Sequence, residues 1–145
     1  PQATVLASDL SGEALEVARA NARALSANLH PFRADLLEAC RADWLDLVVC
    51  NPPYVPEEEA AGLPREVRDY EPAIALLGGP RGIGFYGRLF AGAARALRSG
   101  GWLIVELGYR SRPEVEPLAG PEWSSRIVEK DLAGFERVLV LRKRR

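Results

Sequence analysis

The amino-terminal part of the chain alternates short apolar runs with one longer amphipathic segment. Residues 3–9, ATVLASD, predict a buried strand that ends at Asp9, and residues 12–25 carry apolar side chains at helical spacing. Ser11 is the expected N-cap of this helix, because a serine at that position can accept a hydrogen bond from an unpaired backbone N–H. A short extended segment, residues 29–35, ends at Asp35.

The clearest strand is residues 45–50, LDLVVC, which are almost continuously apolar and rich in valine. Such a run is typical of a strand that is covered on both faces. Residues 51–72 are rich in proline and glutamate and predict a long loop, with one helical turn at residues 57–62. Loops of this length tend to be functional.

The remaining pattern predicts two further helices and three strands. A helix is expected from Ile83 to Arg98, with Gly100-Gly101 as its stop signal, followed by a strand at 102–107. A second helix is expected near residues 112–119. The last two strands, 125–130 and 137–142, are joined by so few residues that an antiparallel pair is predicted.

This order of elements predicts the α/β fold class, with a mostly parallel sheet and an antiparallel carboxyl-terminal strand pair. A length of 145 residues suits a single domain, residues 1–145. Ligands of such sheets bind at the carboxyl ends of the strands. Four polar residues fall at or just past predicted strand ends and are expected to line one rim: Asp9, Asp35, Asn51 and Glu106.

The composition excludes several kinds of function. The net charge of −1 gives no overall basic field, so direct binding of nucleic acid is not expected. The chain has no apolar run of about 18 residues and no signal-peptide pattern, so no membrane association is expected. Two cysteines do not form a disulfide framework, and a cytoplasmic location is expected.

The chemistry is concentrated in Asn51-Pro52-Pro53-Tyr54, directly after the clearest strand. The Asn51 side-chain oxygen and the Pro52 carbonyl are two acceptors that match the two hydrogens of a planar –NH2 group. The Tyr54 ring can stack on the face of an amide or a base. The segment therefore predicts a site for a flat, nitrogen-bearing group.

Such a nitrogen is a poor nucleophile because its lone pair is delocalised. Hydrogen bonds from both of its hydrogens to fixed acceptors favour a more pyramidal nitrogen, and a strong electrophile such as a sulfonium methyl can then react with it. Positioning and electrostatics carry most of this chemistry. A strand-ending turn is the simpler interpretation of two prolines alone, but the flanking asparagine and tyrosine favour a functional role.

At these residues the sequence resembles the class I S-adenosylmethionine-dependent N-methyltransferases. More closely, it is similar to the protein-(glutamine-N5) methyltransferases that modify peptide chain release factors. Asn-Pro-Pro-Tyr alone is shared with methyltransferases of DNA adenine and ribosomal RNA, whereas Tyr70-Glu71-Pro72 followed by ALLGG is more specific to the glutamine group. The resemblance covers nearly the whole chain, through residues 8–22, 46–56, 70–86, 97–108 and 131–138.

The resemblance implies a Rossmann-like sheet, S-adenosylmethionine as the cofactor, and a release factor as the protein partner. It implies that Asp9 accepts hydrogen bonds from the ribose hydroxyls of the cofactor, and that Asp35 and Leu36 hold the adenine edge. It further implies cofactor and substrate contacts for Asn51. The other substrate-binding residues would be Pro52, Pro53 and Tyr54, and the catalytic ones Asn51, Pro52 and Tyr54; no metal is implied.

The sequence departs from the family at its amino end. The family's first strand, its Gly-rich loop and its helical amino-terminal domain have no counterpart before residue 1, so a partial catalytic domain is expected. Loss of a central strand would leave a gap in the sheet or make two strands pair anew. Unpaired edge groups invite association with another chain, so self-association is a further expectation.

Two alternatives stay open beside methylation of a release factor glutamine. One is N-methylation of an exocyclic amine in ribosomal RNA or DNA, and the other is a catalytically silent fragment without a complete cofactor site. A third possibility, dinucleotide binding by the G-x-G-x-x-G of residues 82–87 with Glu106 after it, is disfavoured. A true fingerprint follows a strand directly, whereas Gly78-Gly79-Pro80-Arg81 intervenes here.

Overall fold

The computed structural model describes residues 3–145, which form two compact units that divide after Cys40. Each unit is described by itself. The strands form two sheets, one in each unit, with the orders β1-β2 and β3-β4-β6-β5. The single domain predicted for residues 1–145 stays a prediction.

The first unit is a strand–helix–strand motif, as its sequence pattern predicts. It consists of β1 (Val5–Asp9), α1 (Gly12–Ala24) and β2 (Leu29–Arg33), and the two strands pair in parallel. Ser11 caps the helix, because its hydroxyl oxygen accepts a hydrogen bond from the Ala14 N–H at 3.1 Å. The predicted strand end at Asp9 and the predicted N-cap are both confirmed.

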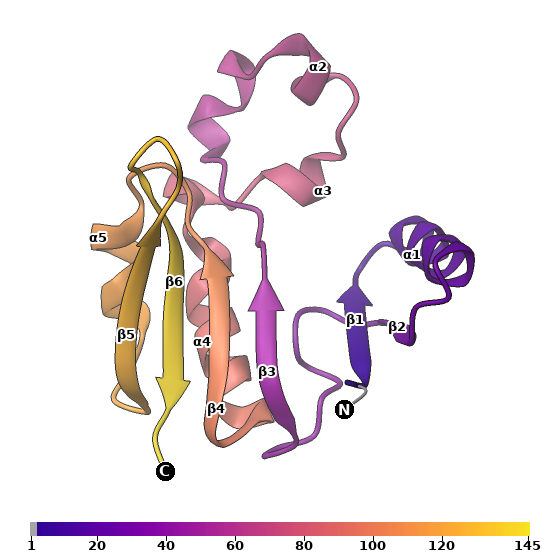
Figure 1. The fold of residues 1–145 in the computed structure, drawn as a ribbon. Helices are drawn as coiled ribbons and strands as arrows, with labels where there is room; N and C mark the ends of the chain where they lie inside the picture. The colour runs from indigo at the N-terminus through magenta and orange to yellow at the C-terminus, as the bar shows by residue number, and fades with distance from the viewer. Residues whose placement is uncertain (1–2) are drawn as a thin grey trace. The chain divides into compact units, whose positions relative to one another are not determined.

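The second unit holds the four-stranded sheet, in which β4 lies between β3 and β6 (Figure 1). β3 pairs in parallel with β4, whereas β4–β6 and β5–β6 are antiparallel. The antiparallel finish is therefore confirmed. The elements are β3 (Leu45–Cys50), η1 (Glu57–Gly62), α2 (Arg65–Arg68), α3 (Ala73–Leu76), η2 (Pro80–Gly82), α4 (Gly84–Ala96), β4 (Leu97–Glu106), α5 (Arg112–Val115), η3 (Glu116–Leu118), β5 (Trp123–Lys130) and β6 (Glu136–Lys143).

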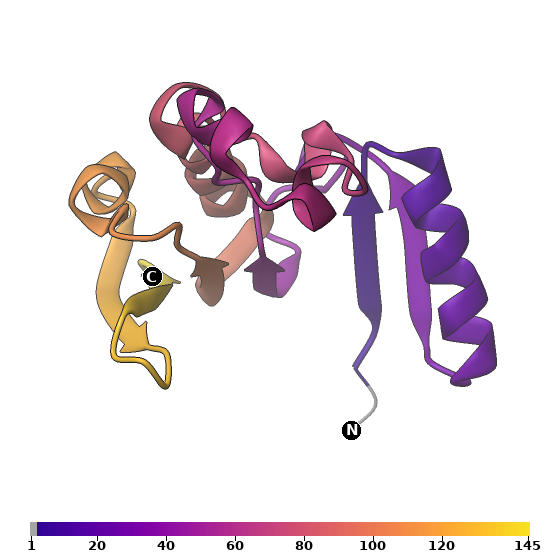
Figure 2. The same ribbon diagram turned by 90° about the horizontal axis from the view of Figure 1, so that it is seen from above.

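The core of the second unit lies between α4 and one face of its sheet. Figure 2 shows α4 and α5 on the same side of the four-stranded sheet. Most of the fully buried side chains come from α4 and from alternate positions of β4 and β6, as expected for strands with one covered face: Tyr86, Leu89, Phe90, Leu103, Val105, Leu139 and Leu141. Val115 of α5 is also fully buried. This packing supports the carboxyl ends of β3 and β4, next to the Asn-Pro-Pro-Tyr segment and Glu106.

The opposite face of the sheet is open, which corrects the expectation that β3 is covered on both faces. Leu47 is 49% exposed and Val49 is 69% exposed, whereas Val48 between them is buried. Ile127 on β5 is also exposed. The reason is the placement of α4 and α5 on one side only (Figure 2).

The helix over residues 84–96 ends earlier than predicted. Leu97 already has extended backbone angles, and β4 begins there. Gly100, with φ +78°, therefore lies within β4 and does not terminate the helix. A register shift in the β3–β4 pairing falls at the same place, between the partners of Leu45 and Leu47, so the glycine pair allows the strand to bend.

We expect the chain to self-associate through β3, which is an edge strand of its sheet with two exposed apolar side chains. Val49→Lys puts a charge on this edge and is expected to shift the sedimenting species toward a single chain. Val17→Lys is the matched control, because Val17 is a 60% exposed valine on α1. A wild-type chain that sediments as one species of monomer mass at all concentrations would contradict the expectation.

Within residues 3–145, the helices are all too short or too polar to cross a membrane.

Candidate functional site

The first unit brings three of the predicted site residues to one edge of its sheet: Asp9, Asp35 and Leu36. β1 and β2 are parallel, so their carboxyl ends meet at the same edge. The Ala34 N–H donates to the Asp9 carbonyl oxygen at 3.2 Å. The Ser8 hydroxyl donates to the Leu36 carbonyl oxygen at 3.0 Å. These two bonds tie the segment after β2 to the end of β1.

The Asp9 carboxylate is exposed and already oriented. Its Oδ1 accepts a hydrogen bond from the Ser11 N–H at 2.7 Å, which leaves Oδ2 as an acceptor for an external hydroxyl. Leu36 has a left-handed backbone conformation with φ 48°, which is uncommon for a residue with a side chain. This edge therefore offers a carboxylate and a backbone segment of unusual conformation.

The second unit places Asn51 and Glu106 at the same edge of its sheet. Cys50 at the end of β3 is in register with Val105 of β4, and Asn51 and Glu106 are the next residues of the two parallel strands. Asn51 is exposed, whereas Pro52 directly after it is buried. The polar side chain therefore stands at the surface on a backbone that is packed below it.

The backbone of the Asn-Pro-Pro-Tyr loop, residues 51–54, is held by a glycine-rich segment, residues 78–84. Beyond the loop, the Gly78 N–H donates to the Val55 carbonyl oxygen at 2.9 Å. A Cβ on Gly78 would lie 2.7 Å from the Pro53 carbonyl oxygen, and one on Gly82 would overlap the Tyr54 carbonyl oxygen. Only glycine permits these approaches, and Gly82 also has φ +69°.

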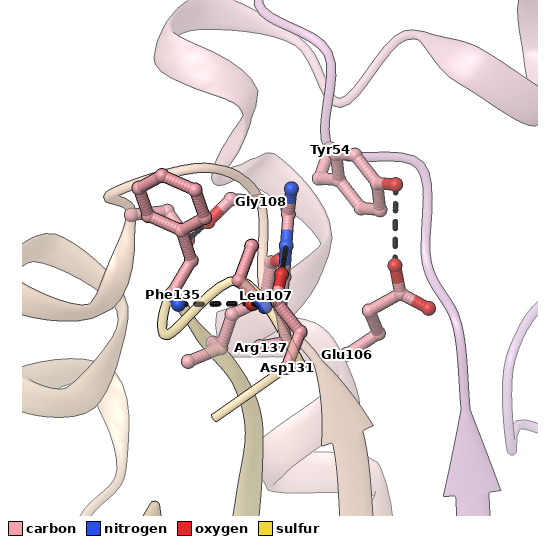
Figure 3. A network of polar contacts seen from close by, with 9 residues as sticks. Tyr54, Glu106, Leu107, Gly108, Asp131, Phe135 and Arg137 are labelled. Atoms are coloured by element: carbon pink, nitrogen blue, oxygen red, sulfur yellow. Dashed lines mark hydrogen bonds and ion pairs between the residues drawn. The ribbon is translucent and has the colours of Figure 1, made fainter. Parts of the chain in front are cut away.

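The Tyr54 side chain is fixed from the side of β4. Its hydroxyl donates to Glu106 Oε1 at 3.2 Å (Figure 3). A Cβ on Gly108 would lie 3.2 Å from the Tyr54 Cβ, so the segment after β4 packs directly on the tyrosine. The ring is thus bounded by a carboxylate on one side and by a glycine on the other.

The segment after β4 is in turn held by Tyr86 of α4, which is fully buried. The Tyr86 hydroxyl donates to the Glu106 carbonyl oxygen at 2.9 Å and accepts from the Gly108 N–H at 3.3 Å. Burial raises the pKa of Tyr86 to about 12, so the phenol remains neutral and can keep donating. The positions of Glu106 and Gly108 are therefore set by the helix core.

The environment of Tyr54 and Cys50 excludes two kinds of catalysis. Burial, and then the Glu106 carboxylate, raise the pKa of Tyr54, whereas the positive charge of Arg137 acts in the opposite direction. A neutral phenol cannot serve as a general base at neutral pH. Burial also raises the pKa of Cys50 to about 11, so this thiol is not a nucleophile at neutral pH.

We expect Glu106→Gln to lower the pKa of Tyr54 relative to the wild type. The substitution removes the negative charge that opposes formation of phenolate, while burial of the ring remains. The variant should therefore ionise Tyr54 at lower pH, as measured by NMR titration of the tyrosine ring carbons. Glu129→Gln on β5 is the control and should leave the titration unchanged; equal curves for the wild type and Glu106→Gln would contradict the expectation.

The structure also explains part of the glycine pattern of residues 82–87. These glycines come after the helical turn α3, within η2 and in α4, so a strand does not lead directly into them as a dinucleotide fingerprint requires. Gly82 instead contacts the Asn-Pro-Pro-Tyr loop. Sequence reasoning missed the roles of Gly82, Gly108 and Tyr86. The one available signal was Gly108, a glycine two residues after the end of a strand at Glu106.

Residues 3–145 contain no cluster of three or more histidine, cysteine or acidic side chains that could hold a metal ion.

Comparison with known proteins finds methyltransferases similar to this chain. Residues 1–63 match the family model of the methyltransferase small domain. The release factor glutamine methyltransferase of Koribacter versatilis is 40% identical over 144 residues, which cover 99% of this chain and 51% of the relative. That of Moorella thermoacetica is 40% identical over 148 residues, covering 99% and 52%. The chain thus spans about half the length of the curated relatives it matches.

Solved structures agree on the fold. A methyltransferase from Pyrococcus furiosus has a TM-score of 0.69 at 16% identity, covering 98% of this chain and 64% of that protein. TrmN from Thermus thermophilus has a TM-score of 0.66 at 23% identity, covering 99% and 37%. The predicted fold class, the Rossmann-like α/β sheet of the class I methyltransferases, is therefore confirmed.

Proposed function

Because this chain belongs to the family of the release factor glutamine methyltransferases, we propose that it is the catalytic part of an S-adenosylmethionine-dependent N-methyltransferase. Its proposed substrate is the side-chain amide nitrogen of a glutamine in a peptide chain release factor. The observation that carries the proposal is the Asn-Pro-Pro-Tyr loop, where an exposed Asn51 stands on a backbone held by glycine contacts.

The loop binds the amide through fixed acceptors. The Asn51 side-chain oxygen and the Pro52 carbonyl accept the two N–H groups of the glutamine amide. Pro52 is buried, its own ring restricts its φ, and Pro53 after it restricts its ψ, so its carbonyl keeps its direction. The neutral Tyr54 ring packs on the face of the amide, and its hydroxyl is already occupied by Glu106.

These contacts change the reactivity of the nitrogen. With both hydrogens held by acceptors, the nitrogen becomes more pyramidal and its lone pair is less delocalised into the carbonyl. Formation of the new C–N bond would break the C–S bond of the sulfonium, whose sulfur would leave as a neutral thioether with the electron pair of that bond. The methylated nitrogen would then carry a positive charge and be strongly acidic, so it would release a proton to water without a dedicated base. Preorganised acceptors that stabilise developing positive charge account for most of the rate enhancement.

The residues at the edge of the first unit fit the adenosine part of S-adenosylmethionine. Asp9 offers a carboxylate oxygen to a ribose hydroxyl, and its orientation is set by the bond to Ser11. Asp35 and Leu36, in the segment after β2, would hold the adenine edge. When bound, the cofactor supplies an electrophilic methyl group on a sulfonium. This set of donors and acceptors suits a nucleoside.

The cofactor assignment is tested by calorimetric titration of S-adenosylmethionine into the 145-residue chain and into Asp9→Asn. The asparagine keeps an oxygen for the Ser11 N–H and replaces the second carboxylate oxygen with an amide nitrogen, so a weaker affinity reports the loss of a ribose contact. Asp46→Asn is the control, since its exposed carboxylate pairs with Arg98. A folded chain without saturable binding would support the catalytically silent fragment.

The substrate assignment is tested by measuring transfer of a labelled methyl group, catalysed by the full-length gene product, to separate candidate substrates. Release factor, ribosomal RNA and DNA are offered separately, and the modified residue is identified by mass spectrometry. The proposal expects one methyl group on a glutamine of the release factor. Label on an exocyclic amine of RNA or DNA, with none on the release factor, would refute the glutamine assignment.

A further inference from the structure

Two exposed aromatic rings lie beside the Asn-Pro-Pro-Tyr loop and take no part in the function proposed above. Tyr109 is 54% exposed and Phe135 is 41% exposed. They come from the turn after β4 and from the loop between β5 and β6, and their rings meet edge to face with centroids 5.1 Å apart. We call Tyr109, Arg110 and Phe135 the aromatic shelf.

The turn that carries Tyr109 and Arg110 is rigid and strained. The Ser111 N–H donates to the Gly108 carbonyl oxygen at 3.1 Å, and the Ser111 hydroxyl donates to the same oxygen at 3.0 Å. Arg110 therefore occupies a central position of the turn, and it has φ 55°. A residue with a side chain is held in this left-handed region only where the surrounding structure imposes it, and such residues cluster at binding sites.

The loop that carries Phe135 is also preorganised, by Asp131. The Asp131 Oδ1 accepts from the Ala133 N–H and the Phe135 N–H, both at 2.9 Å. These bonds, led by the one from Phe135, hold the pKa of Asp131 below its usual value, so the carboxylate stays charged at neutral pH. Both aromatic residues are therefore presented with little conformational entropy left to lose on binding.

The aromatic shelf is continuous with the proposed substrate site. Gly108, the residue before Tyr109, packs on Tyr54 with a distance of 3.2 Å from its built Cβ to the Tyr54 Cβ. Figure 3 shows the rings of Phe135 and Tyr54 on the two sides of the Gly108 segment, with Arg137 between them in this view. The shelf is therefore within reach of a chain that presents a side chain to Tyr54.

The charges of the shelf suit a polypeptide. The Arg110 guanidinium carbon lies 5.0 Å from the Tyr109 ring centroid, and in residues 3–145 no carboxylate pairs with it. The nearby Arg137 already donates to Asp131 and to the Leu107 carbonyl oxygen. One unpaired cation beside two aromatic rings is the composition of protein-binding hot spots, whereas nucleic acid is bound through many phosphate contacts.

We propose that the aromatic shelf binds the polypeptide that flanks the target glutamine, and so selects the protein substrate. This inference rests on the proposed function, and it adds an interaction surface to the catalytic loop. The rings contact apolar side chains of the substrate segment, and Arg110 donates to its main-chain carbonyl oxygens or to an acidic side chain. The net charge of −1 is consistent with a protein partner and gives no support for a nucleic acid.

The experiment compares three variants of the full-length gene product. Tyr109→Ala/Phe135→Ala removes both rings. Arg110→Gly removes the cation but relieves the left-handed conformation, so it is expected to keep or raise the melting temperature. Trp44→Ala is the matched control, because Trp44 is a 50% exposed aromatic residue just before β3, at the other end of that strand from Asn51.

The readouts are the Kd for the unmodified release factor by calorimetric titration, KM and kcat for methyl transfer, and the Kd for S-adenosylmethionine. The double variant should raise the release factor Kd and KM by about tenfold or more. Arg110→Gly should raise them by less. For both, kcat and cofactor affinity should stay at the wild-type values, and Trp44→Ala should change nothing.

The outcomes separate this inference from the proposed function. If the double variant kept the wild-type Kd and KM, the role of the aromatic shelf in substrate binding would be refuted. A wild-type protein that does not bind the release factor would refute it as well. Binding that depends on the shelf without methyl transfer would refute the proposed function and support the shelf. Shelf-dependent binding of RNA in place of the release factor would overturn the inference in favour of a nucleic-acid surface.

Discussion

Replacing Asn51 by alanine is expected to lower kcat for methyl transfer by about two to three orders of magnitude, the effect typical of removing one preorganised polar group from an active site. The variant loses the acceptor that holds one amide hydrogen, so the substrate nitrogen stays planar. Because Asn51 is exposed at the end of β3, the fold should be unaffected. Single-turnover kinetics with the full-length gene product measure the effect.

The matched control for this substitution is Asn21→Ala. Asn21 is an exposed asparagine in α1, and alanine there is a better helix former, so activity and stability should stay at or above wild type. Circular dichroism and melting temperature verify that Asn51→Ala is folded. If folded Asn51→Ala retained kcat within a few-fold of the wild type, the role assigned to this side chain would be wrong.

Replacing Gly82 by alanine is expected to destabilise the protein by about 2–5 kcal/mol, from the sum of backbone strain and overpacking. The added Cβ would overlap the Tyr54 carbonyl oxygen, and φ at this position is +69°. Relief of the overlap requires the Asn-Pro-Pro-Tyr loop to move, so methyl transfer should also fall. Denaturant unfolding and kinetics of the same preparation measure the two effects.

Gly79→Ala separates the two causes. Gly79 has φ +77°, but a Cβ there would have no atom within 4 Å. Its ψ of −165° places it in a region that is essentially restricted to glycine, so its cost should be the conformational one alone, about 1–3 kcal/mol, with activity retained. If Gly79→Ala and Gly82→Ala were equally destabilising and equally active, close packing of Gly82 on the loop would not be what the glycine provides.

The elements and the chemistry of the loop could be predicted from local sequence. Alternating apolar and polar runs predicted β1, α1, β3 and the β5–β6 pair, because side-chain periodicity reports directly on which face of an element is buried. Ser11 as an N-cap followed from its position before the first helical turn. Asn51 and Tyr54 were identified because an amide and a phenol after a strand have few structural reasons to be there.

Other features depended on distant segments and were misjudged or missed. The run LDLVVC predicted a strand covered on both faces, but the exposure of Leu47 and Val49 depends on where α4 and α5 pack. Gly100-Gly101 suggested a helix stop, yet pairing with β3 extends β4 back to Leu97. In each case a tertiary contact overrode the local preference.

By itself, the sequence determined the α/β class of this protein, the position of its strands and the loop that carries its acceptor groups, since these depend on side-chain periodicity and on the chemistry of adjacent residues. Only the tertiary structure decided how the loop is held. Gly82, Glu106 and Gly108 are 28 to 54 residues away from Tyr54 in the chain, yet each contacts it. The same holds for the shelf, because Tyr109 and Phe135 meet only when β4 and β6 pair. Contacts between such distant positions leave no local pattern, because they arise from strand pairing and from packing on Tyr86.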